Sequence, residues 1–106
     1  MTPAEITVEE LASRRAAGDG LVVLDVREPD ELAAAALAGT IAIPMREVPL
    51  RESELPRDRP LAVLCHHGSR SDRVARWLRA HGFDATNIAG GIDAWSVRID
   101  PAVPRY

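Results

Sequence analysis

The nine residues from Leu64 to Asp72, LCHHGSRSD, hold most of the side chains in this sequence that could do chemistry. They include Cys65, which is the only cysteine of the chain, two of its three histidines, and Arg70. A deprotonated cysteine is a nucleophile, and thiolate and imidazole groups are both metal ligands. Three interpretations are therefore open: a reactive thiol in an anion-binding loop, a metal site, and an ordinary turn around a buried cysteine.

A reactive thiol is the interpretation that the surroundings of Cys65 favour. The residue follows an apolar run, Leu61–Leu64, that is typical of a buried strand, and ligands of parallel sheets bind at the carboxyl ends of strands. Gly68 lets the loop turn its N–H groups inward, and the helix that follows adds its N-terminus to this anion cradle. Such a cradle favours the thiolate. The predicted site comprises Cys65 as the nucleophile and a binding loop of six residues: His66, His67, Gly68, Ser69, Arg70 and Ser71.

Arg70 and the two loop histidines have open roles at this point. Arg70 is either a permanent cation that contacts the bound anion or a link from the loop to a carboxylate such as Asp25 or Glu28. His66 and His67 are expected to line the mouth of the loop, where imidazole adds positive charge or moves a proton; the alternative is that they are exposed and without a role. Adjacent residues rarely point at one ion, and no second Cys or His pair exists, so no metal is expected.

The segments around this loop alternate between short apolar runs and amphipathic stretches. Thr7 and Glu10 have the spacing of a capping box, and in the segment after Ser69 the residues Val74 and Leu78 share one face. Strands are expected at residues 21–26, 41–43, 61–64 and 84–88, and helices from 7 to 18, from 29 onward, from 69 to 82 and over 92–97. Helical signals in 45–55 are interrupted by Pro49. This alternation predicts an α/β fold of three layers, with a mainly parallel central sheet flanked by helices.

Length and charge exclude several classes of protein. The 106 residues suit one domain, 1–106, and the formal net charge of −3 argues against binding to nucleic acid. One cysteine cannot form an internal disulfide, and no apolar run is long enough for a membrane span. The acidic start lacks the core of a signal peptide, so a cytoplasmic protein is expected. Nothing in the surface pattern indicates a dimer, so the expected state is a monomer.

Five blocks of the sequence, in this order, resemble the rhodanese family of sulfurtransferases. They are Leu24–Glu28, Ile43–Pro44, Cys65–Ser71, Gly82–Phe83 with Asn87, and Gly90–Trp95. The loop and the closing residues Val103–Tyr106 are also similar to small single-domain rhodaneses and to rhodanese domains attached to sulfur-carrier-activating enzymes. The resemblance covers almost the whole chain and implies the rhodanese-like fold.

The resemblance implies that Cys65 accepts the outer sulfur of thiosulfate or of a persulfide donor, holds it as a persulfide, and passes it to cyanide, a thiol or a sulfur-carrier protein. It implies no cofactor, small sulfur donors and thiophilic acceptors as partners, and a cysteine desulfurase or a sulfur-carrier protein as candidate protein partners. Asp25 and Arg27 correspond to an acidic and basic pair that supports the loop. His66 and His67 stand where rhodaneses that favour thiosulfate carry Arg or Lys, so persulfide donors are expected to work better.

Two other functions remain as alternatives. A cysteine-dependent phosphatase or arsenate reductase has a related loop, but it places five residues between Cys and Arg, whereas four lie between Cys65 and Arg70. A non-catalytic rhodanese-like binding or regulatory module is the other alternative, although most such modules lack the cysteine. The sequence also departs from the family at Ala35–Leu37, where a Gly-His-Ile turn is common, which leaves one wall of the site undefined.

Overall fold

A five-stranded sheet, parallel throughout, forms the centre of the computed structural model, which describes residues 4–106. The strand order is β1-β5-β4-β2-β3. The strands are β1 (Glu5–Ile6), β2 (Val22–Asp25), β3 (Ile41–Ala42), β4 (Leu61–Leu64) and β5 (Ala85–Ile88). The α-helices are α1 (Val8–Ala17), α2 (Pro29–Ala34), α3 (Ser69–Ala80) and α4 (Gly91–Arg98), and two 3-10 helices, η1 (Met45–Leu50) and η2 (Glu52–Glu54), lie between β3 and β4.

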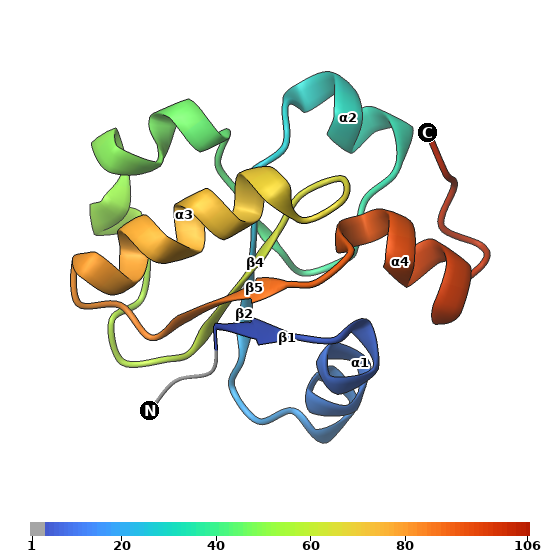
Figure 1. The fold of residues 1–106 in the computed structure, drawn as a ribbon, viewed down its shortest axis with the longest axis horizontal. Coiled ribbons are helices and arrows are strands. Elements are labelled where there is room, and N and C mark those ends of the chain that lie inside the picture. Colours follow the sequence, from blue (N-terminus) through green and yellow to red (C-terminus); the bar gives the residue numbers. More distant parts are fainter. Residues whose placement is uncertain (1–3) are drawn as a thin grey trace.

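Helices cover both faces of the sheet, which confirms the predicted three-layer α/β architecture (Figure 1). α3 and the 3-10 helices pack on one face, and α1 and α4 pack on the other. Each face of the sheet has its own hydrophobic core, and alternate residues of β4 belong to one or the other. Val63 lies on the α3 face, and Ala62 and Leu64 lie on the α1 face. Because β4 is buried on both faces, its sequence is a continuous apolar run.

The first and last residues of α1 are determined by capping residues next to them in the sequence. Thr7 caps α1 by accepting a hydrogen bond from the N–H of Glu10, as the capping box predicts, and Gly18 ends the helix in the left-handed conformation. In α3 the predicted apolar face, Val74 and Leu78 included, is buried against the sheet.

Three features of the fold differ from the sequence-based expectation. β1 was not expected, because two residues are too few to show an alternating pattern; it pairs with β5 at an edge of the sheet. The segment 45–55 forms 3-10 helices, since Pro49 has no N–H for an α-helical hydrogen bond. β2, β3 and β5 are each shorter than expected by one or two residues, whereas β4 has the expected bounds, 61–64.

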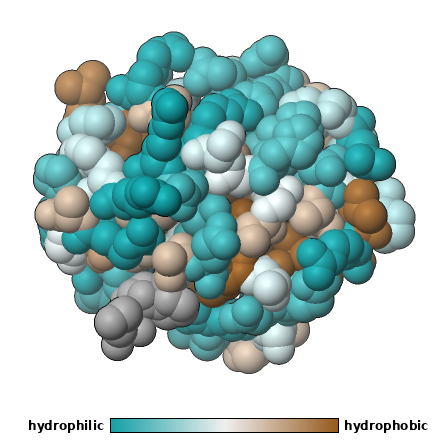
Figure 2. Space-filling model, in the orientation of Figure 1, coloured by the Kyte–Doolittle hydropathy of each residue, from teal (hydrophilic) through white to brown (hydrophobic). Residues whose placement is uncertain are grey.

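The surface is mostly hydrophilic in the view of Figure 2, and hydrophobic side chains occupy smaller areas of it. Among the described residues, the most exposed large hydrophobic side chain is that of Leu50 in η1. No described helix is both long enough and apolar enough to cross a membrane.

Candidate functional site

Cys65 lies directly after β4, at the carboxyl edge of the sheet, and its side chain is almost fully buried at 1% exposure. The N–H of Gly68 donates a hydrogen bond to Sγ over 3.1 Å, and Gly68 adopts a φ of 111°, which a residue with a side chain rarely adopts. The loop thus folds back over its own cysteine. α3 starts at Ser69, so the N-terminus of a twelve-residue helix points toward the same region.

The hydroxyl group of Ser71 contacts the sulfur from the first turn of α3. Oγ of Ser71 lies 3.1 Å from Sγ of Cys65 and 2.5 Å from Oδ1 of Asn87. The Asn87 amide is fixed in orientation, because its NH₂ group donates to the carboxylate of Glu5 and to the carbonyl of Gly68. The single hydroxyl proton can therefore be donated to Asn87 while the sulfur carries a proton, and to the sulfur once it is a thiolate.

Replacement of Ser71 with alanine is expected to lower the rate at which iodoacetamide alkylates Cys65 at neutral pH by roughly fivefold. The variant removes one hydrogen bond to the thiolate, worth about 1 kcal/mol, together with the hydrogen bond between Ser71 and Asn87. Alkylation followed by mass spectrometry measures the rate. Ser13→Ala, which removes an exposed hydroxyl on α1, is the control and should react as the wild type does. Equal rates for all three proteins would exclude a role for the hydroxyl in stabilising the thiolate.

The guanidinium group of Arg70 contacts the carboxylate of Glu31 in α2. Asp25 and Glu28, the two candidates named from the sequence, are not its partners. Two nitrogens of its guanidinium group bind the two oxygens of Glu31 over 2.6 and 2.8 Å. The hydrogen bonds from Arg70 lower the pKa of Glu31 to about 2, against the opposing effect of burial. The pair is therefore fully formed above the ordinary pKa of glutamate, and its contribution to stability is lost as the pH falls toward 2. Of the two roles predicted for Arg70, the structure shows the one in which it links the loop to a carboxylate, here that of Glu31.

Asp25 and Arg27 form a fully buried ion pair beneath α2. The guanidinium group of Arg27 also donates to the carbonyl oxygens of Glu31 and Ala35 and to the hydroxyl of Tyr106. Burial lowers the pKa of Arg27, but the hydrogen bonds to Asp25 and Tyr106 outweigh it and raise the pKa overall. Ala35 thus contributes through its backbone carbonyl, and a turn follows at Ala38–Gly39, although the segment Ala35–Leu37 departs from the family's common Gly-His-Ile.

Tyr106 brings the end of the chain to the site, next to α2 (Figure 1). Its ring stacks on His66 at 3.9 Å between centroids, and its hydroxyl donates to Glu31. Burial is the main cause that raises the pKa of Tyr106. The contacts join the loop, α2 and the C-terminal segment in one network.

His66 and His67 lie side by side at the mouth of the loop, with ring centroids 3.9 Å apart. His67 is exposed, whereas Nε2 of His66 is buried and has no hydrogen-bond partner among residues 4–106. Asp93 of α4 lies close to both rings, with an oxygen 4.0 Å from Nε2 of His67. The rings therefore line the mouth of the loop, as expected.

Gly91 allows α4 to approach the back of the loop. The N–H groups of Ile92 and Asp93 donate to the carbonyl oxygens of Cys65 and His66, over 2.9 and 3.1 Å. A Cβ atom on Gly91 would lie 2.5 Å from each of those two oxygens. The first turn of α4 therefore fixes the backbone of the cysteine itself.

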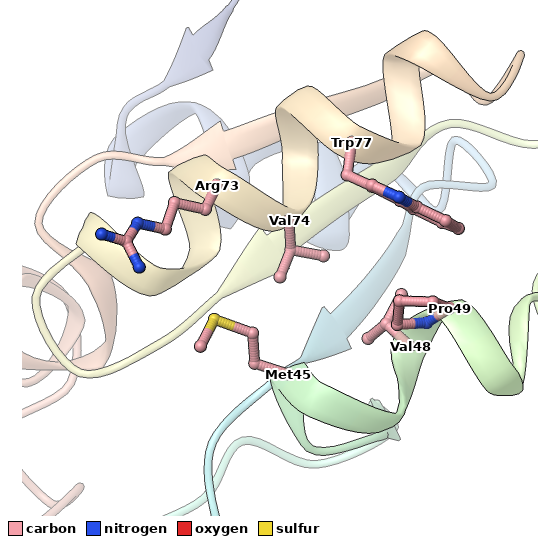
Figure 3. A pocket seen from close by; sticks show the side chains of 6 residues that line it. All are labelled: Met45, Val48, Pro49, Arg73, Val74 and Trp77. Atoms are coloured by element: carbon pink, nitrogen blue, oxygen red, sulfur yellow. The ribbon is translucent and has the colours of Figure 1, made fainter.

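A separate apolar hollow of about 170 Å³ lies between η1 and α3 (Figure 3). Its lining side chains are Met45, Val48, Pro49, Arg73, Val74 and Trp77. None of them belongs to the loop around Cys65, so the hollow is a neighbour of the candidate site and not part of it.

The structure thus brings the predicted site residues together and adds others. Cys65, Gly68 and Ser71 meet at the sulfur, Arg70 faces α2, and Asp25 and Arg27 support α2 from below. Sequence reasoning missed the roles of Glu31, Asn87, Tyr106 and Asp93, and it gave Ser71 only a backbone role. Asn87, Asp93 and Tyr106 lie in the stretches that carry the family resemblance, and this was the signal that could have linked them to the loop. Glu31 lies outside those stretches and carries no such signal.

The fold and the site together define a class of protein. It is a parallel α/β domain with its one cysteine in a loop at the carboxyl edge of the sheet. The sequence matches the rhodanese-like domain family over residues 7–98. The chain therefore belongs to the rhodanese-like family.

Individual relatives agree with this assignment. A sulfurtransferase of Allochromatium vinosum is 34% identical, over 87% of this chain and 87% of that protein. The rhodanese-like/PpiC domain-containing protein 12 of Arabidopsis thaliana is 40% identical over 96% of this chain, which spans only 37% of that protein. The crystal structure of a rhodanese-related protein from Thermoplasma volcanium superposes with a TM-score of 0.86 at 33% identity, covering 98% and 100% of the two chains. Longer relatives are named adenylyltransferase and sulfurtransferase, and the chain spans 23–26% of their length.

Proposed function

We propose that the protein is a sulfurtransferase in which Cys65 carries the transferred sulfur as a persulfide. The observation that supports this most directly is the pair of donors at Sγ, the N–H of Gly68 and the hydroxyl of Ser71, at the N-terminus of α3. Donors of this kind stabilise a thiolate, and they can stabilise the extra negative charge of a persulfide as well. The sulfurtransferase names of relatives at 31–34% identity agree with the proposal.

The reaction takes place in two displacements at sulfur. The Cys65 thiolate attacks the outer sulfur of the donor, the donor's S–S bond breaks, and sulfite or a thiolate leaves with the bonding electron pair. A nucleophilic acceptor then attacks the outer sulfur of the persulfide, and the Cys65 thiolate leaves in turn. No net oxidation occurs, so the cycle needs neither a redox partner nor a cofactor.

A persulfide is the donor that we propose in preference to thiosulfate. Thiosulfate carries two negative charges, and the side chain best suited to bind its sulfonate group, Arg70, is already neutralised by Glu31. The two residues after the cysteine are histidines, which provide less fixed positive charge than Arg or Lys. The same pairing of Arg70 makes phosphate-ester hydrolysis the less supported chemistry.

A protein acceptor or donor is the partner that we propose for the cell. Cys65 is buried at the base of the loop, but His67, two residues further along, is exposed, so the loop itself reaches the surface. Relatives in which a rhodanese-like domain is part of an adenylyltransferase and sulfurtransferase support transfer to a sulfur-carrier protein. A cysteine desulfurase would be the corresponding source of the sulfur.

Intact-protein mass spectrometry tests the proposal. After incubation with a small persulfide, the wild type is expected to gain the mass of one sulfur atom and to lose it on addition of cyanide, while Cys65→Ser gains nothing. Thiosulfate at the same concentration should load a smaller fraction of the protein. No gain from either donor would overturn the sulfurtransferase assignment, and equal or faster loading by thiosulfate would overturn the donor preference.

A further inference from the structure

His66, His67 and Asp93 form a group of potential metal ligands at the mouth of the loop. One ligand atom from each residue lies within 4.8 Å of the other two. Asp93 comes from α4, more than 20 residues along the chain, so the group is created by the fold and does not follow from the His-His pair alone. Adjacent residues rarely point at one ion, but the two rings of this pair lie 3.9 Å apart, and a ligand atom of each lies within 4.8 Å of one from Asp93.

The packing of His66 leaves one of its nitrogens without a partner. Tyr106 stacks on one side of the ring and His67 lies on the other, so the ring is held in place. Its Nε2 atom is buried and accepts or donates no hydrogen bond to residues 4–106. A buried polar atom without a partner costs free energy, and a bound ion or water at this position would remove that cost.

We propose that His66, His67 and Asp93 bind a divalent transition-metal ion of the Zn²⁺ class. Two imidazole nitrogens and one carboxylate oxygen are a usual three-residue ligand set for Zn²⁺, and the fourth coordination position stays open to water. Ligand atoms about 2.0–2.1 Å from a tetrahedral ion lie roughly 3.3 Å from one another. The ligand atoms must therefore come closer together than the observed limit of 4.8 Å, and the side chain of His67, at 65% exposure, is the most exposed of the three.

Arg105 is the group with which the ion competes. Its Nε and Nη2 atoms donate to the two oxygens of Asp93, over 2.9 and 3.3 Å. Arg105 therefore occupies the same carboxylate that would bind the ion. Both side chains are partly exposed, so this ion pair is weak and can be exchanged for a bond to metal.

Zinc titration of the full chain carrying Cys65→Ser tests the site, because this background removes the thiol as a competing ligand and makes the result independent of sulfur transfer. Calorimetry with ZnCl₂ is expected to show one ion per chain with a dissociation constant in the micromolar range or tighter. Adding His67→Ala or Asp93→Asn should weaken binding by at least about tenfold. His81→Ala removes the one histidine outside the group and serves as the matched control with unchanged affinity.

Arg105→Gln gives the sharpest result, since the removal of a competitor should tighten binding whereas damage to the fold would weaken it. Absorption of Co²⁺ in the visible range gives a second measurement of the number and geometry of the ligands. Circular dichroism of each variant verifies that it is folded. Absence of stoichiometric binding, an affinity that Asp93→Asn leaves unchanged, or an equal loss in His81→Ala would overturn the site.

Discussion

An Arg27→Lys variant is expected to lose about 3 kcal/mol of the free energy of unfolding, although the positive charge is kept. For a chain of this size the loss corresponds to a melting temperature lower by roughly 10–20 °C. Urea denaturation followed by circular dichroism measures the change. Arg46→Lys is the matched control, because Arg46 pairs with Glu28 at the surface with 70% of its side chain exposed, and its loss should be within about 0.5 kcal/mol.

Arg27→Lys is destabilising because all five N–H donors of the buried Arg27 guanidinium group have acceptors. Nε and one proton of Nη2 bind Asp25, the other Nη2 proton binds the carbonyl of Ala35, and Nη1 donates to Glu31 and Tyr106. A lysine ammonium group has three donors on a single atom and cannot reach positions this far apart. Acceptors left unpaired in the interior cost about 1–3 kcal/mol each. A loss below about 1 kcal/mol would contradict this account of the network.

A Gly91→Ala variant is expected to lose about 3 kcal/mol of stability and to load sulfur much more slowly than the wild type. Two costs add: a left-handed φ of 60° in a residue with a side chain, about 1–2 kcal/mol, and crowding of the carbonyl oxygens of Cys65 and His66 by the new methyl group, about 1–3 kcal/mol. Since those two carbonyls belong to the site, relief of the crowding must displace the backbone of the cysteine.

Gly18→Ala separates the two costs. Gly18 has nearly the same φ, 63°, but a Cβ atom there would meet nothing within 4 Å. This variant should lose only about 1 kcal/mol and keep the wild-type rate of sulfur loading. Equal losses in the two variants, measured by urea denaturation, would show that contact between α4 and the loop is unimportant.

The fold could be predicted from sequence because its main determinants are local. The apolar run 61–64 is fully buried in the sheet, the run 22–24 is mostly buried, and the face of α3 that includes Val74 follows from helical spacing alone. The capping box at Thr7 fixed one helix start in the same way. β1 could not be predicted, because two residues at an edge are defined by their pairing with β5 and not by a pattern of their own.

The candidate site could be predicted only in part. The position of Cys65 at the end of a buried strand and the turn at Gly68 follow from residue types that are neighbours in sequence. The partner of Arg70 depends on where α2 lies relative to the loop, and four carboxylates occur within seven residues: Asp25, Glu28, Asp30 and Glu31. Only the packing of α2 over the Asp25–Arg27 pair decides among them. The stacking of Tyr106 on His66 likewise depends on the path of the last residues.

The burial of Cys65 also determines which oxidation products we expect when the protein is stored in air. A disulfide between two copies of the chain requires both sulfurs to be in direct contact, and a side chain with 1% exposure at the base of a loop cannot provide this without opening the loop. Oxidation by a small molecule such as hydrogen peroxide requires no contact between two sulfurs. We therefore expect oxidation on storage to give single chains with added oxygen at the sulfur, and not covalent dimers.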